Sequence, residues 1–365
     1  MQIRAVRSRV VAVPIRRPVV ARIGRYDRIW FVLVDVETDA GISGLSYLWA
    51  FSPHGARAVQ DVLHELAEVA VGEDPFFSTR LWRRMWSRIT QWGHKGLSVI
   101  GMAGIDIAVW DIVGKSLGQP LAHVLGAHTE RVATYASEGL WLSDDLPGLA
   151  REAEEILAGG FRAIKMRLGR PRMQDDLEAV RIVRQTIGPR VQLLVDANQG
   201  WDADYTIRIG RRLEEDEAFD LLWIEEPVAH DDLVGHARIA AALDTPLASG
   251  ENWYGPQGFR EAIEQRACEV LMPDVERVGG VTGWQRTAAL AEAWNLPICS
   301  HLFPEINVHL IASAPTGYML EHMPWGEVLF QERLALVDGQ VVLPQRPGLG
   351  LSWDTAVVER LAADT

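Results

Sequence analysis

From about residue 130 onward, short apolar runs alternate with segments of helical apolar spacing, and few folds accommodate that alternation. Residues 145–158 repeat their apolar side chains at helical spacing and stop at Gly159 and Gly160, after which 163–167 has the composition of a strand. Eight apolar runs follow this rule: 132–135, 163–167, 191–196, 221–225, 246–251, 270–274, 297–301 and 318–321. Their ends lie about 20 to 30 residues apart, near the ~30 per unit of a (β/α)8 barrel. The sequence therefore predicts an α/β protein built on a modified TIM-type barrel.

The first third of the chain has a different texture, typical of an α+β domain. Residues 30–37 and 42–49 flank a turn at Asp39–Gly41, which is a hairpin signal, and helical patterns follow over about 54–72, 76–90 and 98–118. We predict a capping domain over 1–125, a barrel domain over 126–339, and a tail over 340–365 that returns to the capping domain.

Composition narrows the possible partners and the compartment. A net charge of −13 argues against nucleic acid or an anionic membrane as partner. No apolar run reaches the ~18 residues of a membrane span, and the arginines among the first ten residues interrupt any signal-peptide core. Cys268 and Cys299 both lie in apolar runs, as expected of core residues in a reducing compartment. We expect a cytoplasmic protein that assembles as a homo-oligomer, with an octamer as one candidate state.

Polar residues stand at the ends of the apolar runs, where a barrel enzyme carries its active site. They are Lys165 with Arg167, Asp196 with Asn198, Glu225 with Glu226, Glu251, Asp274, His301 and Glu321. A single buried charge can be a satisfied structural residue, but it is costly unless paired. Because successive predicted strands end in charged residues, we infer an active site at the barrel mouth.

Three of these residues suggest a metal site. Asp196, Glu225 and Glu251 end three consecutive strands, so their carboxylates should converge on one side of the barrel mouth. Oxygen ligands without cysteine or paired histidines are typical of Mg²⁺. The alternative is a carboxylate cluster paired with Arg and Lys.

Two further residues suggest proton transfer. Asp274 and His301 end the next two strands, and a carboxylate next to an imidazole fixes one ring nitrogen and raises the basicity of the other. The alternative is an ordinary core histidine.

The chain resembles the mandelate racemase subgroup of the enolase superfamily over essentially its whole length. The motifs are Asp196-Ala-Asn198, Trp223-Ile-Glu-Glu-Pro227, Gly250-Glu-Asn252, Met272-Pro-Asp274, Gly279–Trp284, Ser300–Phe303, and, in the first domain, Gly44–Trp49 and Ala103–Asp111.

The resemblance implies a role for each residue of the site. Asp196, Glu225 and Glu251 would bind Mg²⁺, and Asp274 with His301 would be the acid/base dyad. Lys165, Glu321 and Ser137 would contact the substrate carboxylate, and Asn198 would also bind substrate. The implied chemistry is removal of the proton α to a carboxylate to give an enediolate.

One departure from the subgroup bears on the reaction. Its racemases resemble one another in a Lys-x-Lys on the second barrel strand, whereas this chain has Lys165-Met-Arg167. A guanidinium is a poor base because it keeps its proton up to a pH of about 12. A racemase needs a base on each face of the substrate, but a dehydratase can use His301 alone. We therefore expect a sugar-acid dehydratase acting on an aldonate or aldarate and forming a 2-keto-3-deoxy acid. The alternatives are a racemase or epimerase of a 2-hydroxy acid, and a catalytically silent barrel that acts as a binding protein.

The segment Arg22–Arg28 is the expected loop over the barrel mouth. Arg25, Tyr26 and Arg28 suit a polyhydroxylated acid, including one with a second carboxylate. The alternative is a loop that points to solvent. The tryptophans are interpreted as core residues.

Overall fold

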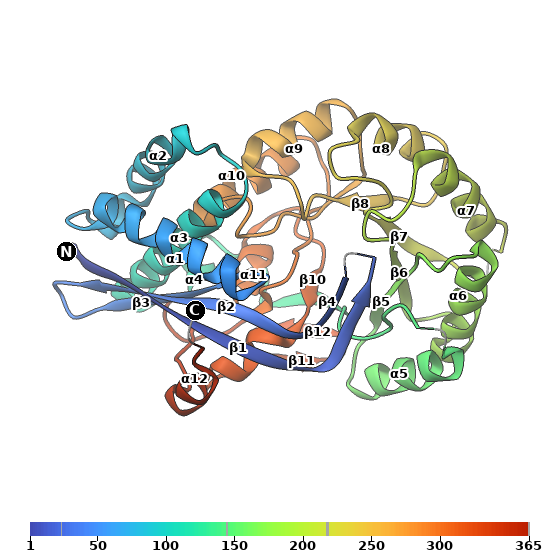
Figure 1. Cartoon of the computed structure of the whole chain (residues 1–365), viewed down its shortest axis with the longest axis horizontal. Helices are drawn as coiled ribbons and strands as arrows, with labels where there is room; N and C mark the ends of the chain where they lie inside the picture. Colours follow the sequence, from blue (N-terminus) through green and yellow to red (C-terminus); the bar gives the residue numbers. More distant parts are fainter. Residues whose placement is uncertain (23, 144, 217–218, 364–365) are drawn as a thin grey trace.

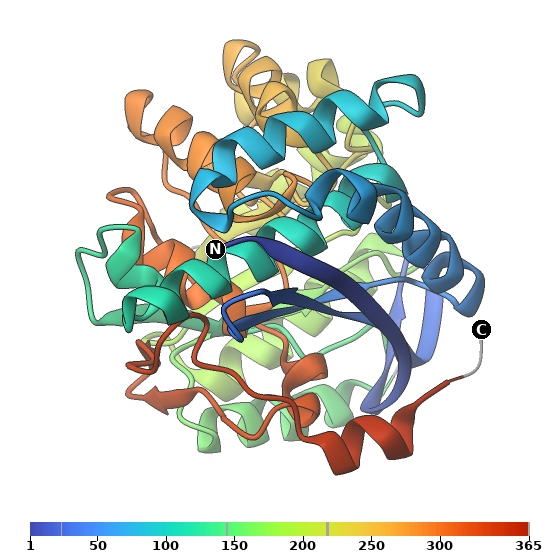
Figure 2. The ribbon, with the colours of Figure 1, turned by 90° about the vertical axis from the view of Figure 1, so that its left-hand side faces the viewer.

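The computed structural model describes residues 1–22, 24–143, 145–216 and 219–363. The chain begins with an antiparallel sheet of three strands followed by four helices, as expected for the first third. The strands are β1 (Ile3–Ala21), β2 (Gly24–Thr38) and β3 (Ser43–Trp49). The helices are α1 (Pro53–Ala70), α2 (Ser78–Arg88), α3 (Leu97–Leu117) and the short α4 (Leu121–Val124). Figure 1 shows this domain beside the barrel, and Figure 2 looks onto its curved sheet.

Helix α3 is the central element of the capping domain. By length and composition it could cross a membrane, which sequence inspection did not detect, but 89% of its most apolar window is buried inside the protein. It packs closely against β3 because Gly44 has no side chain: a Cβ there would lie 1.9 Å from the Ala108 carbonyl oxygen. A core helix surrounded by protein has apolar residues on every side, and α3 follows that rule.

The barrel is a ring of parallel strands enclosed by helices (Figure 1). Its strands are β4 (Arg131–Ala136), β5 (Ala163–Arg167), β6 (Gln192–Asp196), β7 (Leu221–Glu225), β8 (Leu247–Ser249), β9 (Val270–Leu271) and β10 (Leu320–His322). Its helices are α5 (Leu146–Ala158), α6 (Met173–Ile187), α7 (Ala203–Glu215), α8 (Leu233–Ala240), α9 (Gly255–Glu264), α10 (Gly280–Ala293) and α11 (Pro304–Ser313). Among the described residues, the expected strand at 297–301 makes only isolated bridges, which join Leu271 to Ile298, Asp274 to His301 and Ile298 to Gly317. Strand β10 closes the ring on β4.

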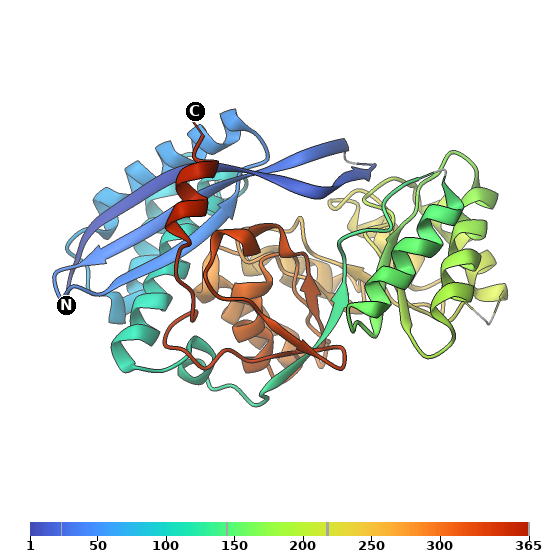
Figure 3. The same ribbon diagram turned by 90° about the horizontal axis from the view of Figure 1, so that it is seen from below.

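The C-terminal tail contacts both domains. Strands β11 (Ala335–Val337) and β12 (Gln340–Val342) form a hairpin whose second strand pairs antiparallel with the barrel strand β4. Only later does the chain reach the capping domain, where α12 (Thr355–Leu361) lies beside β1 (Figure 3) and Ala362 bridges to Val11.

A buried carboxylate joins the two domains. Asp106 of α3 accepts hydrogen bonds from the Thr282 backbone N–H at 2.8 Å and from its hydroxyl at 2.7 Å. Thr282 lies in the first turn of α10, where backbone N–H groups lack partners within the helix. Asp106 thus caps a barrel helix from the other domain.

Asp106→Ala is expected to destabilise the protein by about 1–3 kcal/mol, because it leaves buried donors of Thr282 unsatisfied. Thermal and urea unfolding measure the effect. The matched control is Asp204→Ala, which removes a carboxylate that is 70% exposed and forms a surface ion pair with Arg238, and it should change stability by less than about 0.5 kcal/mol. Equal midpoints for the two variants would mean that the interdomain cap contributes nothing.

Candidate active site

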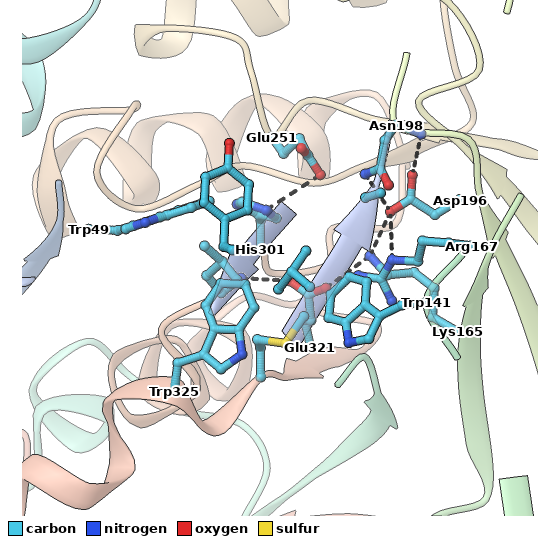
Figure 4. Close-up of a pocket in the computed structure, with 15 residues that line it drawn as sticks. Trp49, Trp141, Lys165, Arg167, Asp196, Asn198, Glu251, His301, Glu321 and Trp325 are labelled. Atoms are coloured by element: carbon cyan, nitrogen blue, oxygen red, sulfur yellow. Dashed lines mark hydrogen bonds and ion pairs between the residues drawn. The ribbon is translucent and has the colours of Figure 1, made fainter. Parts of the chain in front are cut away.

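A cavity lies between the barrel mouth and the capping domain, and most of the residues singled out from the sequence line it (Figure 4). Its lining consists of Val19, Ala21, Tyr26, Trp49, Trp141, Lys165, Arg167, Asp196, Asn198, Glu251, His301, Leu302, Glu321, Met323 and Trp325. The far end of the β1–β2 hairpin reaches across to the barrel (Figures 1 and 3), which explains why residues from both domains line one cavity.

The three candidate metal ligands lie on adjacent barrel strands. Asp196 and Glu225 are direct register partners on β6 and β7, and Glu251 follows β8 after Gly250. Asn198 turns back with a φ of 43°, so that its backbone N–H and its side-chain N–H both donate to Asp196, at 2.8 and 3.1 Å. The carboxylates of Asp196 and Glu225 are fully buried at the carboxyl ends of their strands.

Lys165 lies among these carboxylates. Its ammonium is 2.5 Å from Glu225, 2.9 Å from Glu321 and 3.5 Å from Asp196. Burial disfavours the charged amine, but attraction to Glu225, Glu321 and Asp196 outweighs it and raises the pKa of Lys165. Within the described ranges no three His, Cys, Asp or Glu side chains form a ready-made metal cluster.

The donor set nevertheless fits a divalent cation. Burial, together with repulsion from neighbouring carboxylates, raises the pKa of Glu225 to about 8 and that of Glu251 to about 7, so ionising both carboxyls requires positive charge beyond that of Lys165. Asn198 Oδ1 is buried without a hydrogen-bond partner among the described residues. An all-oxygen donor set matches the preference of Mg²⁺.

The predicted proton-transfer pair is formed. His301 Nδ1 lies 2.7 Å from Asp274 Oδ2, and its other ring nitrogen lies 3.4 Å from Glu251 on the cavity side. Asp274 is in turn held by the backbone N–H groups of Glu276 and Arg277.

The environment makes the imidazole strongly basic. Burial favours the neutral ring, but attraction to Glu251 and the hydrogen bond that His301 donates to Asp274 outweigh it and raise the pKa of His301 to about 9. Glu251 is the largest of the raising causes, so whatever neutralises Glu251 brings the pKa of His301 back toward neutrality.

Arg167 is fixed as a hydrogen-bond donor. Its guanidinium donates to the Ser137 carbonyl at 2.7 Å and to the Ser137 hydroxyl at 3.0 Å, and lies 4.2 Å from the ring centre of Trp141. Its Nε has no hydrogen-bond partner among the described residues, although Asp196 lies 3.6 Å away. Ser137 therefore orients Arg167, rather than lining the cavity itself.

Glu321 is paired with Lys165 and also accepts a hydrogen bond from the Leu302 backbone N–H at 2.6 Å. Burial opposes ionisation, but Lys165 and His301 outweigh it and lower the pKa of Glu321 to about 2. It is a permanent anion between the lysine and the histidine.

Arg25 and Arg28, which were expected over the barrel mouth, do not line the cavity. Residues 24–28 are part of strand β2 rather than a loop, and neighbouring strand residues face opposite sides. Tyr26, paired with Val19, lines the cavity, whereas Arg25 lines a separate hollow with Arg16 and Arg17. The side chain of Arg28 is 53% exposed and close to Asp27. The prediction that Arg25 and Arg28 grip the substrate is not supported.

Three tryptophans were missed as site residues. Trp49, Trp141 and Trp325 line the cavity, although the sequence interpretation assigned every tryptophan to the core. Trp141 follows β4 and Trp325 follows β10, and segments after barrel strands build the mouth of this fold. The position of Trp141 and Trp325 directly after a barrel strand was the sequence signal that could have identified them as site residues.

Comparison with known proteins agrees with this geometry. Residues 3–126 match the mandelate racemase/muconate lactonizing enzyme N-terminal domain, and residues 148–357 match the enolase C-terminal domain-like family. The chain is 36% identical to a 3,6-anhydro-α-L-galactonate cycloisomerase of Streptomyces coelicolor over 91% of each chain. It is 33% identical to an L-talarate/galactarate dehydratase of Salmonella typhimurium, over 88% of this chain and 80% of the relative. A crystal structure of an enolase from the alphaproteobacterium bal199, with bound magnesium, superposes with a TM-score of 0.95 at 35% identity and covers 99% of both chains.

The fold and the barrel-mouth site thus define an enolase-type barrel protein. The chain belongs to the mandelate racemase/muconate lactonizing enzyme family of the enolase superfamily.

Proposed function

We propose that this protein is a Mg²⁺-dependent lyase that removes the proton α to the carboxylate of a sugar acid and expels the oxygen at the β carbon, giving a 2-keto-3-deoxy acid. The observation that carries the proposal is the asymmetry of the cavity: His301 is a strong base held by Asp274, whereas Arg167 is held as a donor (Figure 4). One base suffices for elimination, but racemisation needs two.

Asp196, Glu225 and Glu251 would hold the metal ion. When bound, Mg²⁺ stabilises the negative charge that develops on the carboxylate of the substrate as the proton leaves. The protein's own cations reinforce this stabilisation, since Lys165 lies next to the same carboxylates and Arg167 keeps one N–H free for a substrate oxygen.

His301 carries the proton through both halves of the reaction. Its Nε2 takes the α proton, and the electron pair of the broken C–H bond forms the enediolate. The C–O bond at the β carbon then breaks, and the imidazolium returns its proton to the leaving oxygen. Hydroxide leaves as water, and the resulting enol converts to the 2-keto acid.

A second candidate keeps the same steps but changes the leaving oxygen. The name of the Streptomyces relative describes a sugar acid with an anhydro ring. If the β oxygen belongs to such a ring, its expulsion opens the ring and no water is lost. Both reactions give a 2-keto acid, and the mass of the product separates them.

Screening aldonic, aldaric and anhydro-aldonic acids for 2-keto-acid product tests this function. We expect at least one acid to give a keto acid with Mg²⁺ present, lighter than the substrate by one water for dehydration or equal in mass for ring opening. Formation of a C2 epimer without keto acid would show a racemase or epimerase, and would mean that Arg167 acts as a base. The division into domains at residue 125, the cytoplasmic location and the homo-oligomer stay predictions.

A further inference from the structure

Besides the charged barrel residues, three indoles line the cavity, and one of them, Trp141, packs against the guanidinium of Arg167. Trp49 comes from β3, whereas Trp141 and Trp325 come from segments after β4 and β10, and each is less than 10% exposed. The rings of Trp49 and Trp325 meet edge to face with centres 5.7 Å apart (Figure 4 labels both). Val19, Ala21 and Met323 complete this wall. We call these six residues the aromatic wall.

The aromatic wall is fixed by the barrel. The Trp49 backbone N–H donates to Glu276, two residues after Asp274, and the hydroxyl of Tyr47 on the same strand donates to Glu305 of α11. Both carboxylates are fully buried. The wall therefore presents a preformed apolar surface to the substrate.

Beyond Lys165, Arg167 and His301 at the barrel end, the described lining residues of the cavity include no basic side chain for a second carboxylate. Among its described lining residues the only lysine and arginine are Lys165 and Arg167, and both already contact buried partners at the barrel end. Arg25 and Arg28 lie elsewhere. A distal carboxylate would lose its hydration against indoles and would gain no ion pair, which is unfavourable.

Two neutral donors of the wall are unpaired. The indole N–H groups of Trp141 and Trp325 are buried and have no hydrogen-bond partner among the described residues. An indole N–H can donate to a hydroxyl or ether oxygen, while the ring packs against C–H groups. This combination fits an uncharged, partly apolar group.

We propose that the substrate is a monocarboxylic sugar acid whose end remote from the carboxylate is uncharged and presents a C–H face to the aromatic wall. The inference rests on the proposed function for the placement of the carboxylate at Lys165 and the metal ligands. It excludes aldarates, which carry a carboxylate at each end, as preferred substrates.

Three acids of one configuration test the proposal: a hexonate, its 6-deoxy analogue and the corresponding aldarate. Calorimetric titration of the Mg²⁺-loaded protein gives affinities without requiring turnover, and keto-acid formation gives kcat/KM. We expect both monocarboxylates to bind at least about 10-fold more tightly than the aldarate, with the 6-deoxy acid at least equal to the hexonate. An aldarate that binds as tightly as the monocarboxylates would overturn the proposal.

The two readouts separate the inference from the proposed function. Monocarboxylate preference in binding without keto acid from any of these acids or from the wider screen would contradict the lyase assignment alone. Efficient turnover with a preference for the aldarate would contradict the inference alone.

A positive charge introduced into the wall should weaken the preference for the monocarboxylate. Met323→Lys places a cation beside Trp325 and is expected to raise the affinity for the aldarate relative to the hexonate by about 10-fold, while the control Met323→Leu leaves the ratio unchanged. Circular dichroism establishes that each variant is folded. If the folded Met323→Lys variant keeps the wild-type ratio of aldarate to hexonate affinity, the distal end of the substrate does not contact this wall, which would overturn the proposal. If the variant does not fold, the affinity ratio of the wild-type protein decides the proposal.

Discussion

His301→Asn is expected to lower kcat for the elimination by about 10²–10⁴-fold, because it removes the imidazole that is proposed to take the α proton. The amide can still accept or donate a hydrogen bond, but it cannot carry the proton to the leaving oxygen. Steady-state keto-acid formation gives the loss in kcat, and substrate titration shows whether binding is kept.

The matched control is His64→Asn on the exposed surface of α1, which should leave kcat unchanged. A His301→Asn variant that keeps more than about a tenth of wild-type kcat would mean that another residue is the base. In that case the distinction drawn between His301 and Arg167 would fail.

Loss of the metal site should have a comparably large effect. We expect about one Mg²⁺ per chain, and Glu225→Gln should weaken its binding by more than about 100-fold, because even residues that only orient a ligand cost ~10–100-fold when removed. Glu225 is fully buried and in register with Asp196, so a neutral amide cannot replace its charge. Metal analysis after dialysis and activity after chelation measure the effect.

Glu178→Gln, on the exposed face of α6, is the control and should bind metal as the wild type does. Full activity after exhaustive chelation, or unchanged metal content in Glu225→Gln, would contradict the assignment of the carboxylates. Lys165 would then be their permanent partner.

The barrel was predictable because parallel strands covered on both faces produce short, continuous apolar runs. Charged residues directly after such runs, such as Asp196 and Glu225, are conspicuous because burial without a partner is costly. The run at 297–301 was equally apolar, yet among the described residues it makes only isolated bridges. Apolar composition records burial, and it does not record regular hydrogen bonding.

The aromatic wall of the cavity and the positions of the two arginines could not be predicted from the sequence, for two physical reasons. Tryptophan is buried both in a core and in a cavity wall, so the burial of Trp141 or Trp325 does not reveal which it lines. The side that Arg25 faces depends on strand pairing, because one residue along a strand reverses the direction of the side chain. The position of Lys165 among the carboxylates likewise follows from register, which brings β5, β6 and β7 side by side.

The central claim is that His301 removes a proton α to a carboxylate and that elimination follows. Incubating the wild-type protein with Mg²⁺ and an accepted sugar acid in D₂O, and following C2 and C3 by NMR, tests it most directly. We predict 2-keto-3-deoxy acid with solvent deuterium at C3 and no C2 epimer of the substrate. Deuterium at C2 with inversion and no keto acid would contradict the elimination. If no acid exchanged its α proton at saturating Mg²⁺, the chain would be a binding protein built on a silent barrel.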